Sequence, residues 1–208
     1  SSLGREAQGR RDERILFSGL RAPEWLTRWL DILEDERWPL AGVQSPALLT
    51  TPLVRRMAPM VRRMALLGFH PSAGLRQTFI DEQGVKLSRL IPVADEDLAA
   101  LPERMLEESR RALQFLASLR LMSRDEPLAV WIIAPKADWP ALAAVCSDQD
   151  QLHFHWVTPD ELAGQAGLAN AEMLFVEAAV RQRPHNHYAP TERLWYYHLW
   201  LAAKMLRW

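Results

Sequence analysis

The chain has 208 residues, of which 49% are hydrophobic and 25% charged. This composition is typical of one generous globular domain or two small lobes, and not of a disordered chain. The formal net charge of -1 gives no bulk electrostatic reason to expect nucleic acid or an anionic membrane as partner. No uninterrupted apolar run approaches the roughly 20 residues of a membrane span. Because Ser1 to Arg14 is polar and charged, we expect no signal peptide.

The first third of the chain predicts a flexible lead-in at residues 1-12, followed by alternating strands and helices. Residues 13-62 are predicted as a βαβα half-subdomain. Pro23 and Pro46 stand at helix starts, where a missing N–H costs nothing. The predicted elements are strands at Ile15–Leu20 and Leu40–Val43 and helices that begin at Pro23 and Pro46.

Residues 63-183 predict three consecutive strands, followed by helix-linked strands. Gly84 ends a short turn between the second and third strands, where a tight hairpin needs positive φ. We therefore expect an antiparallel meander at the start of this segment. The predicted strands are Met64–Phe69, Leu75–Ile80, Val85–Ile91, Leu128–Ala134 and Leu152–Val157, and the predicted helices are Asp95 to about Ser123, Trp139–Cys146, one from Pro159 and Ala171–Arg181.

The resulting order, βββαβαβα, is that of an RNase H-like or actin-like subdomain with a mixed sheet. The preceding βαβα segment corresponds to the last half of another subdomain of that kind. Residues 184-208 are predicted as a loop followed by an aromatic C-terminal helix. The predicted fold class is therefore α/β, with an RNase H-like subdomain at 63-183.

The turn after the first meander strand is where an actin-like ATPase would bind phosphate. Such a hairpin needs clustered glycines, so that backbone N–H groups approach phosphate, and a carboxylate that positions a metal or water. Here the turn is His70-Pro71-Ser72-Ala73-Gly74, with one glycine and no acidic residue. We predict a degenerate phosphate turn at His70, Ser72 and Gly74, with no cofactor, no metal and no catalytic residue.

Nuclease chemistry of the RNase H kind is also disfavoured by the meander. That chemistry uses several carboxylates to hold two divalent ions, and the predicted strands Met64–Phe69 and Leu75–Ile80, with the turn between them, contain none. Cys146 lies on a short apolar helical stretch, so we do not expect it to act as a nucleophile.

Two histidines lie two residues apart on a predicted strand. His153 and His155 therefore face the same side and could share a metal. No third ligand stands at a useful spacing, and a surface strand explains the pair equally well.

Two arginines lie on the predicted hairpin and are candidate partner-binding residues. Arg76 and Arg89 either pair across the strands with Asp81 or Glu82, or bind a carboxylate of a partner protein. The first alternative is favoured.

The C-terminal helix has almost no polar face. Trp195 and Trp200 are candidate partner-binding residues among several aromatic and aliphatic side chains. One interpretation is a helix packed in the core or in a homodimer interface. The other is a juxtamembrane helix, with tryptophan and tyrosine at headgroup level beside Lys204 and Arg207.

These residues suggest a family. The order of elements, with Leu75-Arg76-Gln77-Thr78-Phe79 and Leu87-Ser88-Arg89-Leu90 on the hairpin, resembles the actin-like (ASKHA) cytoplasmic domains of type IV pilus and type II secretion platform proteins, which are PilM-, GspL- or MshI-like. Ala178-Ala179-Val180-Arg181 and Asn186-His187-Tyr188-Ala189-Pro190 resemble the closing helix and exit of that family.

The resemblance implies a non-catalytic scaffold or adaptor. Family members recruit a hexameric assembly ATPase or the cytoplasmic tail of a pilus or secretion partner, so the implied location is cytoplasmic, at the inner membrane, with attachment through the C-terminal side. This sequence departs from the family where Ala134-Pro135-Lys136 replaces a glycine pair expected at adenosine. The first half-subdomain also lacks its opening meander, so the chain is either a fragment or a trimmed fold. ATP binding is therefore not carried over. The alternatives are a small RNase H-like enzyme with an unrecognised site and a self-associating structural module.

Overall fold

The structure, a computed structural model, describes residues 2–5, 13–15, 19, 23–58, 60–123, 125–149, 151–171, 173–182 and 187–206. The chain divides into two compact units. The larger is Leu49–Arg183, and the smaller combines Ser1–Leu48 with Pro184–Trp208. The larger unit combines helices with a mixed sheet of strands, so the predicted α/β class is confirmed.

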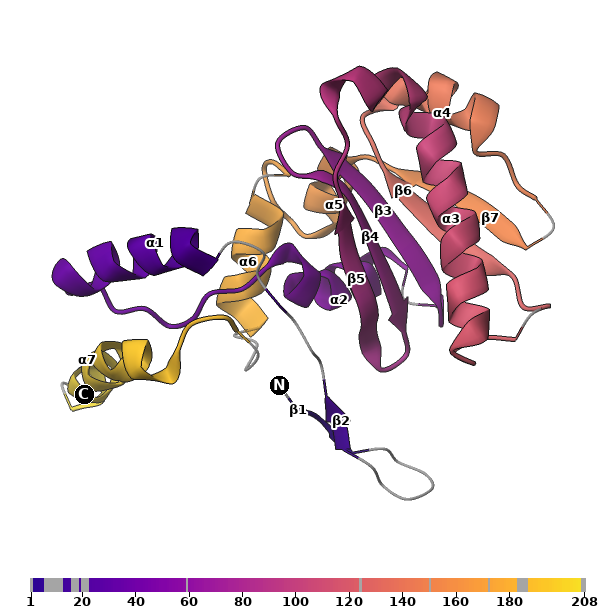
Figure 1. Ribbon diagram of the computed structural model, residues 1–208. Helices are drawn as coiled ribbons and strands as arrows, with labels where there is room; N and C mark the ends of the chain where they lie inside the picture. Colours follow the sequence, from indigo (N-terminus) through magenta and orange to yellow (C-terminus); the bar gives the residue numbers. More distant parts are fainter. Residues whose placement is uncertain are drawn as a thin grey trace. The chain divides into compact units, whose positions relative to one another are not determined.

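The larger unit is built on a mixed five-stranded sheet (Figure 1). Its spatial order is β5-β4-β3-β6-β7. The first three strands in the chain form an antiparallel meander, and β6 runs parallel to β3 as β7 does to β6. The strands are β3 (Met64–His70), β4 (Gly74–Asp81), β5 (Gly84–Ile91), β6 (Leu128–Ile133) and β7 (Leu152–Val157).

The hairpin between β4 and β5 forms as its sequence predicts. Asp81 pairs with Gly84 across a two-residue turn, and Gly84 has φ +112°. The Asp81 carboxylate accepts a 2.8 Å hydrogen bond from Gln83 N–H, a local contact that favours the turn.

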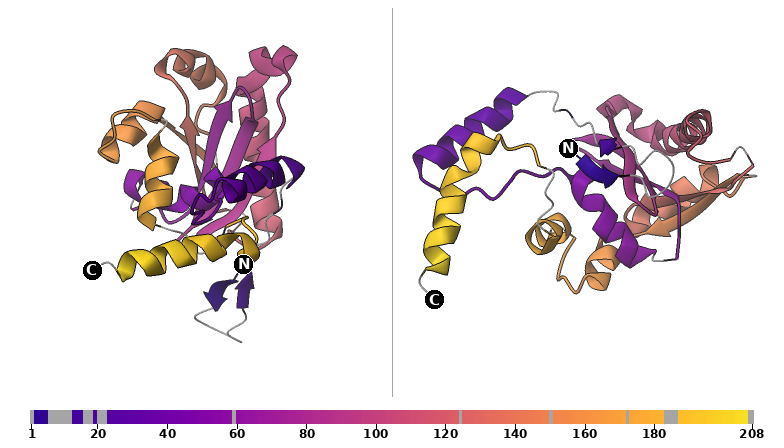
Figure 2. Two further views of the ribbon diagram at one scale, coloured as in Figure 1. Left: turned by 90° about the vertical axis from the view of Figure 1, so that its left-hand side faces the viewer. Right: turned by 90° about the horizontal axis from the view of Figure 1, so that it is seen from below.

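One face of the sheet is covered by α3 (Leu101–Ser118) and α4 (Trp139–Val145), with the short η2 (Lys136–Asp138) before α4 (Figures 1 and 2). Because side chains alternate along a strand, Val130 and Ile132 of β6 face these helices. They form the main core with Met105, Leu116 and Leu142.

The opposite face carries a second layer of helices. These are α2 (Pro46–Met57), α5 (Pro159–Gln165) and α6 (Met173–Gln182). Val54 of α2 packs against Met64 and Leu66, and Leu162 and Leu174 pack in a cluster with Val157. With helices on both faces, β6 is covered on both sides, as its continuous apolar run predicts. Leu128, Val130 and Ile132 are fully buried, and Ala129, Trp131 and Ile133 on the other face are partly buried.

The helix predicted from Asp95 to about Ser123 is in two parts and ends earlier. A 3₁₀ segment, η1 (Asp95–Ala100), precedes α3, which ends at Ser118. Pro102 stands in the first turn of α3, where proline is tolerated. Arg120 has φ 55°, a left-handed conformation that cannot continue the helix.

The smaller unit contains α1 (Pro23–Asp35), η3 (Thr191–Leu194) and α7 (Trp195–Met205). It also contains a two-stranded antiparallel sheet, β1 (Ser2–Arg5) and β2 (Glu13–Ile15). The flexible lead-in predicted at residues 1-12 is therefore wrong for Ser2–Arg5, which find a pairing strand. Of the strand predicted at Ile15–Leu20, Ile15 ends β2, Gly19 has no regular structure, and the other residues lie outside the described ones.

The predicted strand Leu40–Val43 is wrong, and the βαβα half-subdomain at 13-62 does not form as expected. Residues 38–45 have no regular structure. A strand needs a neighbouring ladder, whereas here the Val43 carbonyl accepts a 2.8 Å hydrogen bond from Tyr188 N–H, far along the chain. The contact joins the two segments of the smaller unit. Asn186, at the start of the predicted exit, lies outside the described residues.

Candidate functional site

The turn between β3 and β4 holds the residues predicted as a degenerate phosphate site. His70 pairs with Gly74, so Pro71–Ala73 form the turn. His70 Nδ1 lies 2.9 Å from Ser72 Oγ and accepts a 3.3 Å hydrogen bond from Ser72 N–H. Ala73 N–H donates to the His70 carbonyl at 3.0 Å. The turn therefore engages two of its own backbone donors.

Gly74 in this turn has a structural reason of its own. Its φ is +102°, and a Cβ built there would lie 2.4 Å from the Ile91 carbonyl oxygen. Only glycine combines that conformation with so close an approach to the backbone of β5. The single glycine of the turn therefore serves the packing of β4 against β5.

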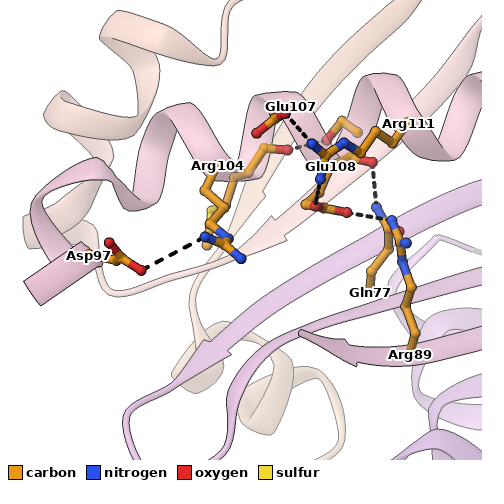
Figure 3. A network of polar contacts seen from close by, with 9 residues as sticks. Gln77, Arg89, Asp97, Arg104, Glu107, Glu108 and Arg111 are labelled. Carbon is orange, nitrogen blue, oxygen red and sulfur yellow. Dashed lines mark hydrogen bonds and ion pairs between the residues drawn. The ribbon is translucent and has the colours of Figure 1, made fainter. Parts of the chain in front are cut away.

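Arg89 enters a polar network between the sheet and α3 (Figure 3). Its Nε donates to Gln77 Oε1 at 2.9 Å, and its Nη2 lies 2.5 Å from Glu108 Oε2. The predicted pairing of Arg89 with Asp81 or Glu82 is therefore wrong, because the β-strand places its side chain on the face that α3 covers. Asp81 pairs instead with Lys86 at 3.3 Å, and Glu82 with Arg62 at 3.5 Å.

Arg76 lies on the other face of β4. Its Nη1 reaches Ser88 Oγ at 3.5 Å, and Ser88 Oγ is 2.9 Å from Thr78 Oγ1. The two predicted arginines alternate with Gln77 and Ser88 on paired strands and so point to opposite faces of the sheet. They do not form one binding site.

Glu108 is the centre of the network, and its role was not predicted from the sequence. Its side chain is 4% exposed, and it accepts from Arg89 on one oxygen and from Arg111 on the other at 2.8 Å. The Gln77 side-chain amide donates to the Glu108 carbonyl at 2.9 Å. The helical spacing could have predicted its burial, because Glu108 lies three residues from Met105 and four from Ala112 on the buried stripe of α3.

The network extends along the exposed side of α3. Arg111 also pairs with Glu107, and Arg104 Nη1 lies 3.9 Å from Asp97 Oδ2 (Figure 3). Arg104 Nε is buried with no hydrogen-bond partner among the described residues. The arrangement attaches α3 to the sheet through alternating charges.

His153 and His155 lie on the edge strand β7, on the same side, as predicted. His155 stacks on Trp131 with ring centroids 4.8 Å apart. His153 Nδ1 is 3.4 Å from Asp148 Oδ2, and the other Asp148 oxygen accepts from Phe154 N–H at 2.7 Å. This backbone hydrogen bond, followed by the one with His153, lowers the pKa of Asp148. Within the described ranges, no three His, Cys, Asp or Glu side chains come close enough to hold a metal ion.

Cys146 directly follows α4 and is buried in the main core, with Sγ 3.5 Å from the Pro102 carbonyl oxygen. Burial, followed by the charge of Glu103, raises the pKa of the Cys146 thiol to about 11. Because the thiolate is the nucleophile, the raised pKa disfavours reaction of this thiol near neutral pH.

The smaller unit contains a cavity of about 470 Å³ between α1, the segment that follows it, and η3–α7. Its lining is mostly apolar, and Trp195 belongs to it. Arg193 and Glu34 also line the cavity, and the two side chains form an ion pair. Arg193 Nη2 lies 2.7 Å from Asp31 Oδ1. The other lining residues are Leu30, Leu33, Arg37, Trp38, Leu40, Tyr196 and Leu199.

Trp200 lies elsewhere on α7. It stacks on Tyr197 with centroids 6.1 Å apart, and Lys204 Nζ lies 5.1 Å from its ring centroid. Positions 195 and 200 are five residues apart and so face different sides of the helix. Arg207, the other cation predicted at headgroup level, lies outside the described residues. In the part of the chain that the structure describes, no helix is both long and apolar enough to span a membrane.

Comparison with protein-family models, with curated proteins and with solved structures returned no match.

Proposed function

We propose that the chain is a non-catalytic scaffold domain of a bacterial pilus or secretion assembly. In this proposal an RNase H-like/actin-like sheet presents surfaces for a protein partner at the cytoplasmic side of the inner membrane. The partner is an assembly ATPase or the cytoplasmic tail of another component.

The fold part of the proposal is supported by the strand order of the larger unit. An antiparallel meander is followed by two helix-linked strands, each parallel to the preceding inner strand. This is the order that an RNase H-like subdomain requires.

The observation that carries the functional part is the β3–β4 turn. An actin-like nucleotide site would use this turn's backbone donors for phosphate. Here His70 Nδ1 accepts from Ser72 N–H, and the only glycine of the turn is fixed by its approach to the Ile91 carbonyl. Because backbone N–H groups of this turn are already hydrogen-bonded within it, we expect the chain to bind its protein partner without nucleotide.

Thermal unfolding of the chain with and without ATP and Mg²⁺ tests this step. A ligand at 100 times its Kd stabilises the folded state by about 2.7 kcal/mol, which raises Tm by several degrees. We expect a shift below about 1 °C. A rise of several degrees would remove the proposal in favour of a nucleotide-binding enzyme.

Partner binding is tested by co-expression with the assembly ATPase and, separately, with the partner's cytoplasmic tail. We expect co-elution that nucleotide and EDTA leave unchanged. Elution of the chain alone in both mixtures would contradict a scaffold role, and elution as a dimer alone would favour the self-associating module.

The membrane part of the proposal depends on α7. Trp195, Leu199 and Trp200 are exposed on it, beside Lys204. Flotation with anionic liposomes is expected to recover the full chain and to lose the chain truncated before Thr191. Equal recovery of both would exclude attachment through this segment.

A further inference from the structure

The outer face of α1 exposes large aromatic side chains in a regular stripe. Trp25 is 64% exposed, Trp29 is 65% and Ile32 is 53%. Their spacing of four and three residues places them on one face of the helix. Side chains of this size make a contiguous apolar surface of a few hundred Å², as large as the patches that mark interaction sites.

The opposite side of α1 is fixed within the smaller unit. Leu30 is buried, and Leu30 and Leu33 line the cavity beside α7. Arg193 ties Asp31 and Glu34 to η3, and the hydrogen bond with Asp31 raises the pKa of its guanidinium. The tryptophan stripe is therefore presented by a helix whose rotation about its own axis is fixed.

Charge indicates what this stripe would bind. Within Pro23–Asp35 there are four acidic residues, Glu24, Asp31, Glu34 and Asp35, against one arginine, Arg28. Glu24, Asp31 and Asp35 follow the helical repeat along one flank of the stripe. Arg28 lies on the same flank and Asp31 pairs with Arg193, so the flank keeps a small net negative charge. An anionic lipid surface would be repelled by this flank. Symmetric pairing of α1 with α1 of a second copy would bring two helices of net negative charge together.

We infer that the Trp25–Trp29–Ile32 face of α1 docks an amphipathic helix of a partner protein, with Lys or Arg flanking the partner's apolar stripe. This inference rests on the proposed function, because it names the chemistry of the scaffold's partner. The tryptophans supply the anchors that dominate such interfaces. The acidic flank sets the orientation of the docked helix and increases its association rate.

The test uses the full chain and two fluorescent 18-residue synthetic helices. Both carry leucine at i, i+3, i+4 and i+7; one has Lys and Arg flanks and the other has Glu flanks. We expect the basic helix to bind at least tenfold more tightly at 50 mM salt, with a smaller difference at 500 mM. Equal binding of the two helices, or binding of neither, would overturn the inference.

Three substitutions locate the site. Trp25→Ala and Trp29→Ala are each expected to weaken binding of the basic helix about tenfold or more. Phe115→Ala, an exposed aromatic of the larger unit, is the matched control and should change binding less than twofold. Because all three side chains are exposed, we expect each variant to fold, and circular dichroism checks this. Equal effects of Trp29→Ala and Phe115→Ala would contradict the assignment.

The native partner is tested by a photo-crosslinking amino acid at position 29, used in cells. A crosslink to a basic amphipathic segment of another protein supports the inference. A crosslink to a second copy, to the chain's own larger unit or to lipid refutes it. Co-elution with the assembly ATPase or the tail that survives both tryptophan substitutions would leave the proposed function standing and remove only this inference. Stabilisation by ATP would remove the proposed function while leaving peptide binding unchanged.

Discussion

Replacing Glu108 by glutamine removes the negative charge from the centre of the network between the sheet and α3. Loss of one partner of a fully buried ion pair costs about 3–5 kcal/mol. Here the arginines are not fully buried, with 41% of the Arg89 side chain and 57% of the Arg111 side chain exposed. Water can therefore hydrate the released guanidinium groups, and we expect a loss of about 2 kcal/mol, near that of one charge-assisted hydrogen bond.

Glu107→Gln is the matched control, since Glu107 pairs with the same Arg111 but is 57% exposed. An exposed pair contributes about 0–1 kcal/mol, so we expect Glu107→Gln to change stability by less than about 0.5 kcal/mol. The stability of the larger unit is measured by hydrogen exchange of the β4 and α3 amides as a function of urea, which isolates this unit from the smaller one. A double-mutant cycle with Arg89→Gln should give a coupling free energy above about 1 kcal/mol. Equal losses of stability for the two glutamate substitutions, or a coupling free energy near zero, would show that Glu108 does not stabilise the unit through Arg89.

Three further outcomes follow from local geometry. Gly74→Ala should destabilise the larger unit by about 2–4 kcal/mol in urea unfolding, because the residue has positive φ and its Cβ would meet a β5 carbonyl; Gly164→Ala, where a Cβ meets nothing within 4 Å, should not destabilise it. Cys146 should react with a thiol reagent at pH 8 about 100-fold more slowly in the folded chain than in urea, because its pKa is raised to about 11 from 9.0. For the same reason the contribution of this thiol to stability is full below pH 9 and is lost between pH 9 and 11. A fast reaction in the folded chain would contradict the burial of Cys146. Asp148→Ala should speed exchange of the Phe154 amide, whose hydrogen bond it accepts, and unchanged protection would show that another group accepts this proton.

The strands of the larger unit could be predicted because their patterns are local. Gly84 in the hairpin between β4 and β5 and the apolar run of β6 each depend on neighbouring residues. The strand predicted at Leu40–Val43 has a similar apolar pattern but no neighbouring ladder. Whether an apolar run becomes a strand depends on the pairing that the rest of the fold supplies.

For the candidate binding residues too, the sequence predicted the element that carries each residue but not the face or contacts of its side chain. Sequence spacing placed Arg76 and Arg89 on one hairpin, but the pleat puts them on opposite faces. Trp195 and Trp200 share one helix, but only Trp195 lines the cavity. Glu108 could have been noticed on the buried stripe of α3, yet its two arginine partners come from β5 and from its own helix, and the strand partner could not be deduced from spacing.

By itself, the sequence determined the α/β class, the order of strands and helices from Met64 onward, and the composition of the β3–β4 turn. These follow from periodicity, turn chemistry and residue identity, all of which act over a few positions. Only the tertiary structure decided that Glu108 neutralises Arg89, that the turn's glycine approaches the β5 backbone, and that Leu30 faces inward while Trp25 and Trp29 face solvent. Each of these depends on which distant segment covers a given face, and that choice is made by packing across the whole unit.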